Sequence, residues 1–104
     1  MLLLFLALAS APALDPPKPI FSYQDYPAEA LRNRWQGSVV ADLTISAEGR
    51  PTACRIVKSS GHKVLDDVTC KLIMTRARFT PAKDQTGKPK ESTLRTPVIE
   101  WRIQ

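Results

Sequence analysis

Histidine, cysteine and aromatic residues are scarce in this chain of 104 residues, which limits the chemistry it can perform. The chain has one histidine and two cysteines, and aromatic residues make up 7% of the sequence. Cys54, His62 and Cys70 have seven residues between each neighbouring pair, unlike the short spacings of common zinc sites, and no C-x-x-C redox pair occurs. No serine or cysteine nucleophile is fixed near His62 by spacing, so we interpret it as an exposed turn residue. We therefore expect no metal, no cofactor and no enzymatic activity.

The chain also lacks the length for a second domain and the composition of a disordered tail. Hydrophobic residues make up 43% and charged residues 24%, close to the globular average. Fifteen lysines and arginines against ten acids give a net charge of +5, which favours anionic partners such as acidic peptides, anionic lipid or envelope polymers. We expect no nucleic-acid partner.

The single long apolar run lies at the N-terminus. Residues Leu2 to Ala9 carry no charge, and Ala11-Pro12-Ala13 has the small-x-small pattern read by signal peptidase. A helix from Leu2 to Leu14 reaches about 20 Å, short of the roughly 30 Å of bilayer hydrocarbon. We predict a signal peptide over residues 1–13, cleaved after Ala13. No lysine or arginine precedes the run, so a truncated signal anchor is the alternative.

If the chain is exported, the two cysteines are first interpreted as a disulfide. Small exported domains use disulfides to compensate for a small core, and a Cys54–Cys70 bond would close a loop of 17 residues. The periodicity places Cys54 on a strand and Cys70 on a helix. We therefore expect the disulfide to join a hairpin to the long helix.

The rest of the chain divides into a short proline-rich leader, residues 14–22, and one domain, residues 23–104. Period-two and helical spacings predict a short helix ended by Gly37, a hairpin, a long helix, a loop and a last strand. Their ranges are Ala28 to Trp35, Ser38 to Ser46 with Thr52 to Lys58, Val64 to Phe79, Thr80 to Lys90, and Glu91 to Ile103. The order α-β-β-α-β predicts an α+β fold with two helices packed on a three-stranded antiparallel sheet. Pro97 should lie on a sheet edge or at a bulge.

Other noticeable residues have a structural explanation. Asp66 and Asp67 point about 100 degrees apart on a helix, so we interpret them as charges that favour a helix start rather than as paired catalytic carboxylates. Trp35 and Trp101 are expected in the core, since each lies at an element end or on an apolar stripe.

At the level of motifs, the chain resembles the TonB C-terminal domain family over about residues 23–103. The resemblance rests on short motifs in consistent order, namely Tyr26-Pro27-Ala28-Glu29-Ala30, Gly37-Ser38-Val39-Val40, Ala47-Glu48-Gly49-Arg50, Ser59-Ser60-Gly61, Leu65-Asp66, Arg76-Ala77-Arg78-Phe79-Thr80-Pro81-Ala82, Gly87-Lys88-Pro89 and Pro97 to Ile103. Ala77 departs from the family, which usually has a tryptophan there. Family transducers also carry an inner-membrane helix and a long proline-rich spacer, and neither is complete here.

The resemblance implies a domain in the periplasm of a Gram-negative bacterium. It would bind the TonB box, an extended segment at the N-terminus of an outer-membrane TonB-dependent transporter. Inner-membrane motor proteins become partners if an anchor is retained, and a homodimer stays open. The alternative is a motor-less accessory module that uses the same fold to bind another envelope protein or polymer.

The physical basis for capturing a strand is an exposed sheet edge, whose unpaired backbone groups accept another strand. The C-terminal strand is our candidate edge. Its expected contact residues are Leu94, Arg95, Thr96, Val98, Glu100 and Arg102. Backbone groups would supply affinity, while Arg95 and Arg102 would select charge. Ordinary solvated strand positions are the alternative interpretation of these two arginines.

Overall fold

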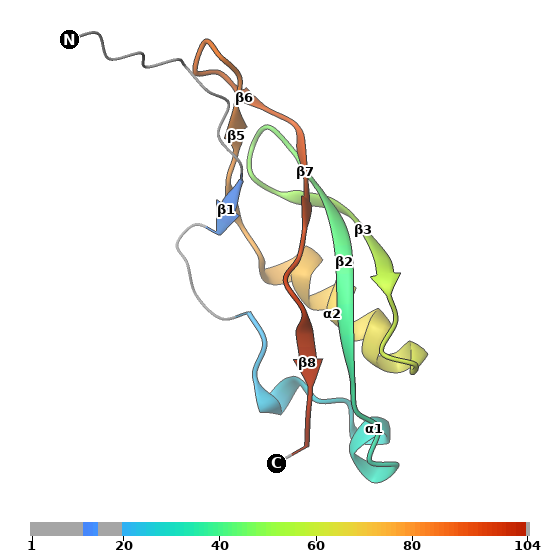
Figure 1. The fold of residues 1–104 in the computed structure, drawn as a ribbon. Helices are drawn as coiled ribbons and strands as arrows, with labels where there is room; N and C mark the ends of the chain where they lie inside the picture. The colour runs from blue at the N-terminus through green and yellow to red at the C-terminus, as the bar shows by residue number, and fades with distance from the viewer. Residues whose placement is uncertain (1–11, 15–19, 104) are drawn as a thin grey trace, which may run out of the picture.

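The computed structural model describes residues 12–14 and 20–103. The predicted leader residues 15–19 and residues 1–11 of the predicted signal segment lie outside this part. Figure 1 shows the elements, which are β1 (Ala13–Leu14), the 3-10 turn η1 (Tyr23–Asp25), α1 (Ala28–Arg32), β2 (Gly37–Ile45), β3 (Pro51–Lys58), α2 (Lys63–Arg76), β4 (Phe79–Thr80), β5 (Ala82–Lys83), β6 (Pro89–Lys90), β7 (Ser92–Arg95) and β8 (Ile99–Trp101).

The main sheet is antiparallel, with β2 at its centre. β3 pairs along one side of β2, and β7 and β8 pair end to end along the other side. The predicted α+β fold is confirmed, and the predicted last strand is realised as two short strands on one edge. Pro97 lies at the break between them, as expected for a residue that cannot donate to a ladder.

Helix α2 covers one face of this sheet, as Figure 1 shows. The inward-facing residues of β2 alternate strictly with half-buried ones, because successive strand side chains point to opposite faces. The core has two clusters along the sheet. One is centred on Trp101 and contains Tyr26, Ala30, Val39, Leu65, Leu72 and Trp101. The other is centred on Phe79 and contains Ala41, Leu43, Ile45, Ile73, Ala77 and Phe79.

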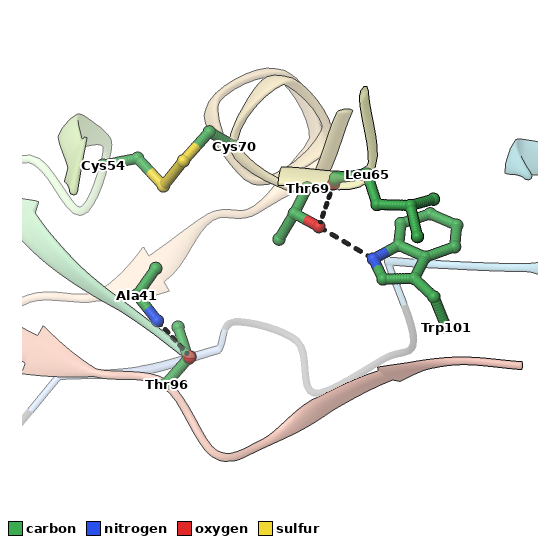
Figure 2. The surroundings of a disulfide bond; sticks show 7 residues. All are labelled: Ala41, Cys54, Leu65, Thr69, Cys70, Thr96 and Trp101. Carbon is green, nitrogen blue, oxygen red and sulfur yellow. Dashed lines mark hydrogen bonds between the residues drawn. A yellow bond between two sulfur atoms is a disulfide. The ribbon is translucent and has the colours of Figure 1, made fainter. Parts of the chain in front are cut away.

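A disulfide joins β3 to α2, between the two cysteines that the sequence analysis pairs (Figure 2). The Cα atoms of Cys54 and Cys70 are 5.7 Å apart, and both residues are half-buried. The bond therefore ties the outer strand of the hairpin to the helix that packs behind it.

The first helix is shorter than predicted and ends differently. It stops at Arg32, and Arg34 adopts the left-handed conformation (φ 56°) that closes a helix end. The N–H of Trp35 donates to the carbonyl of Ala30 at 2.8 Å. Gly37, predicted to end the helix, instead begins β2. A Cβ at Gly37 would lie 2.3 Å from the carbonyl oxygen of Ser60, so close approach explains this glycine.

The long helix also ends before the predicted Phe79. Ala77 is extended, and the N–H of Phe79 donates to the carbonyl of Gly49 at 2.8 Å. Phe79 pairs with Leu14 between β4 and β1. Its buried ring therefore reaches the core from a strand, although its spacing fits the helical pattern.

Two further local predictions are wrong. The predicted loop from Thr80 to Lys90 contains the β5–β6 hairpin, and its turn is built by Asp84, which accepts hydrogen bonds from the N–H groups of Thr86 and Lys88. His62, predicted as an exposed turn residue, is half-buried. Its ring stacks on Trp35 at a centroid distance of 4.9 Å.

Candidate functional site

Both outer sides of the main sheet, β3 on one and β7 with β8 on the other, have no strand beside them in the part of the chain that the structure describes, and the candidate site lies on the second. β7 and β8 pair with β2 on one side, while their opposite side forms the end of the sheet. The break around Pro97 divides this edge into two short stretches. Of these, β8 lies in the lower part of Figure 1, beside the segment that precedes α1.

The hydrogen bonds of Thr96 show which backbone groups face outward. Its N–H donates to the carbonyl of Ala41 at 2.8 Å, and the N–H of Ala41 donates to the Thr96 hydroxyl at 3.1 Å. Backbone groups alternate sides along an antiparallel strand, so Val39, two residues away, also faces this edge. Val39 pairs with Ile99, the residue directly before Glu100. The N–H and C=O groups of Arg95 and Glu100 therefore face away from β2, where another strand can bind them.

Aromatic side chains from the N-terminal part of the domain stand beside β8. The rings of Phe21 and Tyr26 meet Trp101 edge-on, at centroid distances of 5.9 and 5.2 Å. Tyr23 lies 5.8 Å from Tyr26 and is 45% exposed. These contacts bring the segment from Ile20 to Tyr26 against the last strand, although the two are far apart in sequence.

Trp101 is the common anchor of this arrangement, and α2 holds it in place (Figure 2). Its indole N–H donates to the hydroxyl of Thr69 at 2.8 Å, and that hydroxyl donates to the carbonyl of Leu65 at 2.7 Å. Thr69 is fully buried and Trp101 is 4% exposed. The indole is thus held on the α2 side by a satisfied hydrogen bond, while the rings of the aromatic segment also contact it.

Between the aromatic segment and β8 lies a groove of about 220 Å³, which we call the edge groove. β8 and the following Arg102 form one wall, and the segment with the three aromatic rings forms the other, which we call the aromatic wall. Its lining residues are Phe21, Ser22, Tyr23, Tyr26, Ile99, Glu100, Trp101 and Arg102. The edge groove therefore combines backbone hydrogen-bonding groups with an apolar surface, the two features that capture an extended peptide.

Two predicted contact residues form the charged rim of the edge groove. Arg102 Nη2 lies 2.9 Å from Glu100 Oε1, and both side chains are exposed. The hydrogen bond from Arg102 lowers the pKa of Glu100, and the reciprocal bond raises the pKa of Arg102. Both groups therefore stay charged at neutral pH, with their charges already directed toward each other.

Arg95 is engaged elsewhere, on the sheet face opposite α2. Its Nε donates to Asp42 Oδ1 at 2.7 Å, and Arg55 Nη2 donates to Asp42 Oδ2 at 3.0 Å. The hydrogen bond from Arg95 is the main cause that lowers the pKa of Asp42. An acidic partner would have to compete with this carboxylate, so Arg95 is a weaker candidate for charge selection than the sequence suggested.

The remaining predicted contacts differ in exposure. Val98 is 57% exposed beside the break in the edge. Leu94 is half-buried and packs against the Phe79-centred cluster. Thr96 is buried, with its hydroxyl bound to β2. Of these three side chains, only that of Val98 is readily available to a partner.

The aromatic wall was not predicted from the sequence. The predicted domain boundary at residue 23 left Phe21 in the leader, and Tyr26 was used only as part of a family motif. A signal was present, because three of the seven aromatic residues of the chain fall between Phe21 and Tyr26. Such clustering indicates a packed segment rather than a solvated leader.

Comparison with known proteins agrees with this architecture. Residues 22–103 match the family described as the Gram-negative bacterial TonB protein C-terminal. The chain belongs to the TonB C-terminal domain family. It is also 35% identical over 74 residues to Protein tonB2 of Pseudomonas aeruginosa, an alignment that covers 71% of this chain and 27% of that protein. The aligned part of the chain thus spans about a quarter of the length of this relative.

The TonB C-terminal match, residues 22–103, includes β8 and all of the aromatic wall except Phe21. It also includes the departure at Ala77, which is fully buried in the Phe79-centred cluster. The TonB family transduces energy for transport and is not a family of known enzymes. Across residues 12–14 and 20–103, no cluster of His, Cys, Asp or Glu is arranged to hold a metal ion, and no helix is both long and apolar enough to cross a membrane.

Proposed function

We propose that this chain is the partner-capture domain of a TonB-type energy transducer in the periplasm. It would bind the extended N-terminal segment, or TonB box, of an outer-membrane transporter by adding that segment as a strand beside β8. The observation that carries the proposal is the edge groove, where outward-facing backbone groups of β8 lie beside a wall of aromatic rings. Coupling to inner-membrane motor proteins belongs to the same proposal and requires an anchor in that membrane.

Strand addition explains why the two walls differ. Backbone hydrogen bonds at Glu100 and its neighbours would supply affinity for any extended chain. Every second side chain of the bound strand would then point toward the aromatic wall, because side chains alternate along a strand. An apolar residue there would bury its surface against Tyr23 and its neighbours. The edge groove therefore favours an extended segment with apolar residues at alternate positions.

The charged rim would contribute to orientation rather than to most of the affinity. Glu100 and Arg102 are exposed and already paired, and solvent and salt screen an exposed ion pair so that it contributes little to affinity. Charges at such a rim mainly affect the rate and register of association.

An NMR titration of the isotope-labelled full chain tests this proposal. The probes are synthetic peptides copied from the N-termini of outer-membrane transporters of the same cell. We expect chemical-shift changes at Tyr23 and from Val98 to Arg102. Two versions of a binding peptide, N-methylated on alternate residues in opposite phase, then test strand pairing directly. One phase should abolish binding and the other should preserve it, because only alternate N–H groups face β8.

A matched pair of variants tests the aromatic wall. Tyr23→Ala should weaken peptide binding by about tenfold, as expected for an exposed aromatic residue at a contact. Val57→Ala removes an exposed apolar side chain from β3, the opposite edge of the sheet, and should leave affinity unchanged. Equal sensitivity to both N-methylation phases would reject strand addition. A peptide that binds without shifting β8, or binding to an envelope polymer alone, would favour the accessory-module alternative.

A further inference from the structure

The aromatic wall of the edge groove is not part of the sheet. It belongs to the segment from Ile20 to Tyr26, in which η1 is a single helical turn. Because no β-ladder within the described residues holds this segment, its position depends on side-chain contacts. The contacts of Phe21 and Tyr26 with Trp101 attach two of its rings, while the exposed ring of Tyr23 depends on how the turn itself is held.

Arg76, the last residue of α2, binds this segment at two points. Its Nη1 and Nη2 donate to the two carboxylate oxygens of Asp25 at 2.8 and 2.9 Å. Nη1 also donates to the carbonyl of Ile20 at 3.2 Å. One planar guanidinium therefore holds both the start of the segment and its helical turn, a geometry that a lysine ammonium cannot reproduce.

Asp25 also organises the turn from within. Its carboxylate accepts hydrogen bonds from the N–H of Ser22 at 2.9 Å and from the Ser22 hydroxyl at 3.2 Å. The Asp25 side chain is 12% exposed, much less than that of Arg76. The hydrogen bonds from Arg76, then that from the Ser22 backbone, lower the pKa of Asp25 to about 2. Asp25 thus remains an anion at any pH at which the domain would work.

We propose that Asp25 and Arg76 are positioning residues that set the affinity of the edge groove by fixing its aromatic wall against β8. The inference rests on the proposed function. Neither residue lines the groove, so each acts through Phe21, Tyr23 and Tyr26.

Helix α2 has its own attachments to the sheet, so loss of this ion pair should not release the helix. The Cys54–Cys70 disulfide holds its middle to β3, and Thr69 binds Trp101. Breaking the pair should therefore loosen only the segment that carries the wall. A looser wall lowers affinity, because binding must then order the aromatic side chains.

The experiment measures the affinity of the full chain for the transporter-derived peptides, in the wild type and in Asp25→Asn, which keeps the size of the side chain and removes its charge. We expect about tenfold weaker binding, from ordering of the rings on association. Asp67→Asn is the matched control, since it breaks a 2.7 Å ion pair with Lys63 on the exposed start of α2. The control should bind like the wild type.

A double-variant cycle separates positioning from a general structural effect. If Asp25 acts through the aromatic wall, Asp25→Asn should weaken binding much less in a Tyr23→Ala background than in the wild type. Arg76→Lys should recover only part of the affinity that Arg76→Gln loses, because one ammonium group cannot bind both attachment points.

Two results would overturn the inference. If the Asp25→Asn variant binds peptide as tightly as the Asp67→Asn variant, the Asp25–Arg76 pair does not set the affinity. If the effects in the double-variant cycle are fully additive, the pair does not act through Tyr23. In either case, sensitivity to one N-methylation phase would leave the proposed function standing. If the wild type binds no peptide, the proposed function fails first. Contacts between the Phe21 and Trp101 rings, measured by nuclear Overhauser effects in Asp25→Asn, then still report whether the pair positions the wall, and unchanged contacts would reject it.

Discussion

Replacing Thr69 by valine is the most informative change to the support of the edge groove. The Thr69 hydroxyl accepts the indole N–H of Trp101 at 2.8 Å, in a site where Thr69 is fully buried. Valine has nearly the same shape and the same branching at Cβ, so the helix and the packing should change little. The variant therefore isolates the loss of one buried hydrogen-bond acceptor.

The magnitude follows from which groups lose a partner. The indole N–H of Trp101 is left buried and unpaired, which costs about 1 to 3 kcal/mol. The carbonyl of Leu65 loses the hydroxyl as a donor, but it lies four residues before Thr69 within α2, where the helix itself supplies a backbone donor. It adds little to the cost. We expect Thr69→Val to lower the free energy of unfolding by about 2 kcal/mol, a large part of the stability of a domain this small.

Thr69→Ser is the matched control, because serine keeps the hydroxyl and loses one buried methyl group. That loss should cost about 1 kcal/mol. Urea unfolding of the two variants and the wild type under oxidising conditions gives the comparison, with equal m-values required. The indole N–H signal of Trp101 should also exchange faster with solvent in Thr69→Val alone. If valine costs less than serine, and the indole signal does not change, the hydrogen bond does not support Trp101.

Three further predictions address other parts of the fold. Replacing Cys54 and Cys70 together by alanine should lower the free energy of unfolding by up to about 3 kcal/mol in urea titrations without changing peptide preference, and equal stability of oxidised wild type and variant would refute the cross-link. Arg34→Gly should raise the free energy of unfolding by roughly 0.5 to 1 kcal/mol, because arginine is strained at φ 56° whereas glycine is not. A lower free energy of unfolding in this variant would contradict the prediction. Carbon-13 NMR should give Asp25 a pKa of about 2, which moves toward 3.8 in Arg76→Gln. Since the folded pKa is the lower one, the stabilising effect of Asp25 is present above about pH 4 and disappears as the pH falls toward 2, and a pKa near 3.8 in the wild type would exclude the pair in solution.

Local patterns predicted the elements whose packing follows from their own periodicity. The alternation from Val39 to Ile45 gives β2, the glycine at 49 with φ 87° gives the hairpin turn, and the break at Pro97 follows from its missing N–H. The end of α2 was mispredicted because the spacing of Phe79 fits a helix equally well. Only the tertiary bond from Phe79 to Gly49 shows that this residue is extended.

The candidate site, too, could be predicted from the sequence only in part. The exposed edge could be predicted, because a last strand containing a proline belongs at the end of a sheet. The clustered aromatic residues were visible in the sequence, but their place beside β8 could not be predicted locally, because Arg76 and Asp25, which attach the segment, lie 51 positions apart. Local chemistry marks only the turn, where Ser22 and Asp25 cap each other. Which surface the turn lies against is decided by the tertiary contact alone.

The two walls of the edge groove meet at Trp101, and this decides which variants can separate binding from folding. Trp101 belongs to the core cluster, to the hydrogen bond with Thr69 and to the lining of the groove at once. Any change at Trp101 must therefore alter stability and affinity together. Tyr23 is exposed, so its replacement should leave the core intact, whereas Asp25 also stabilises the fold through its bonds to Arg76 and Ser22. Peptide affinity that responds to Tyr23→Ala while the free energy of unfolding stays nearly constant would locate recognition in the aromatic segment rather than in the sheet alone.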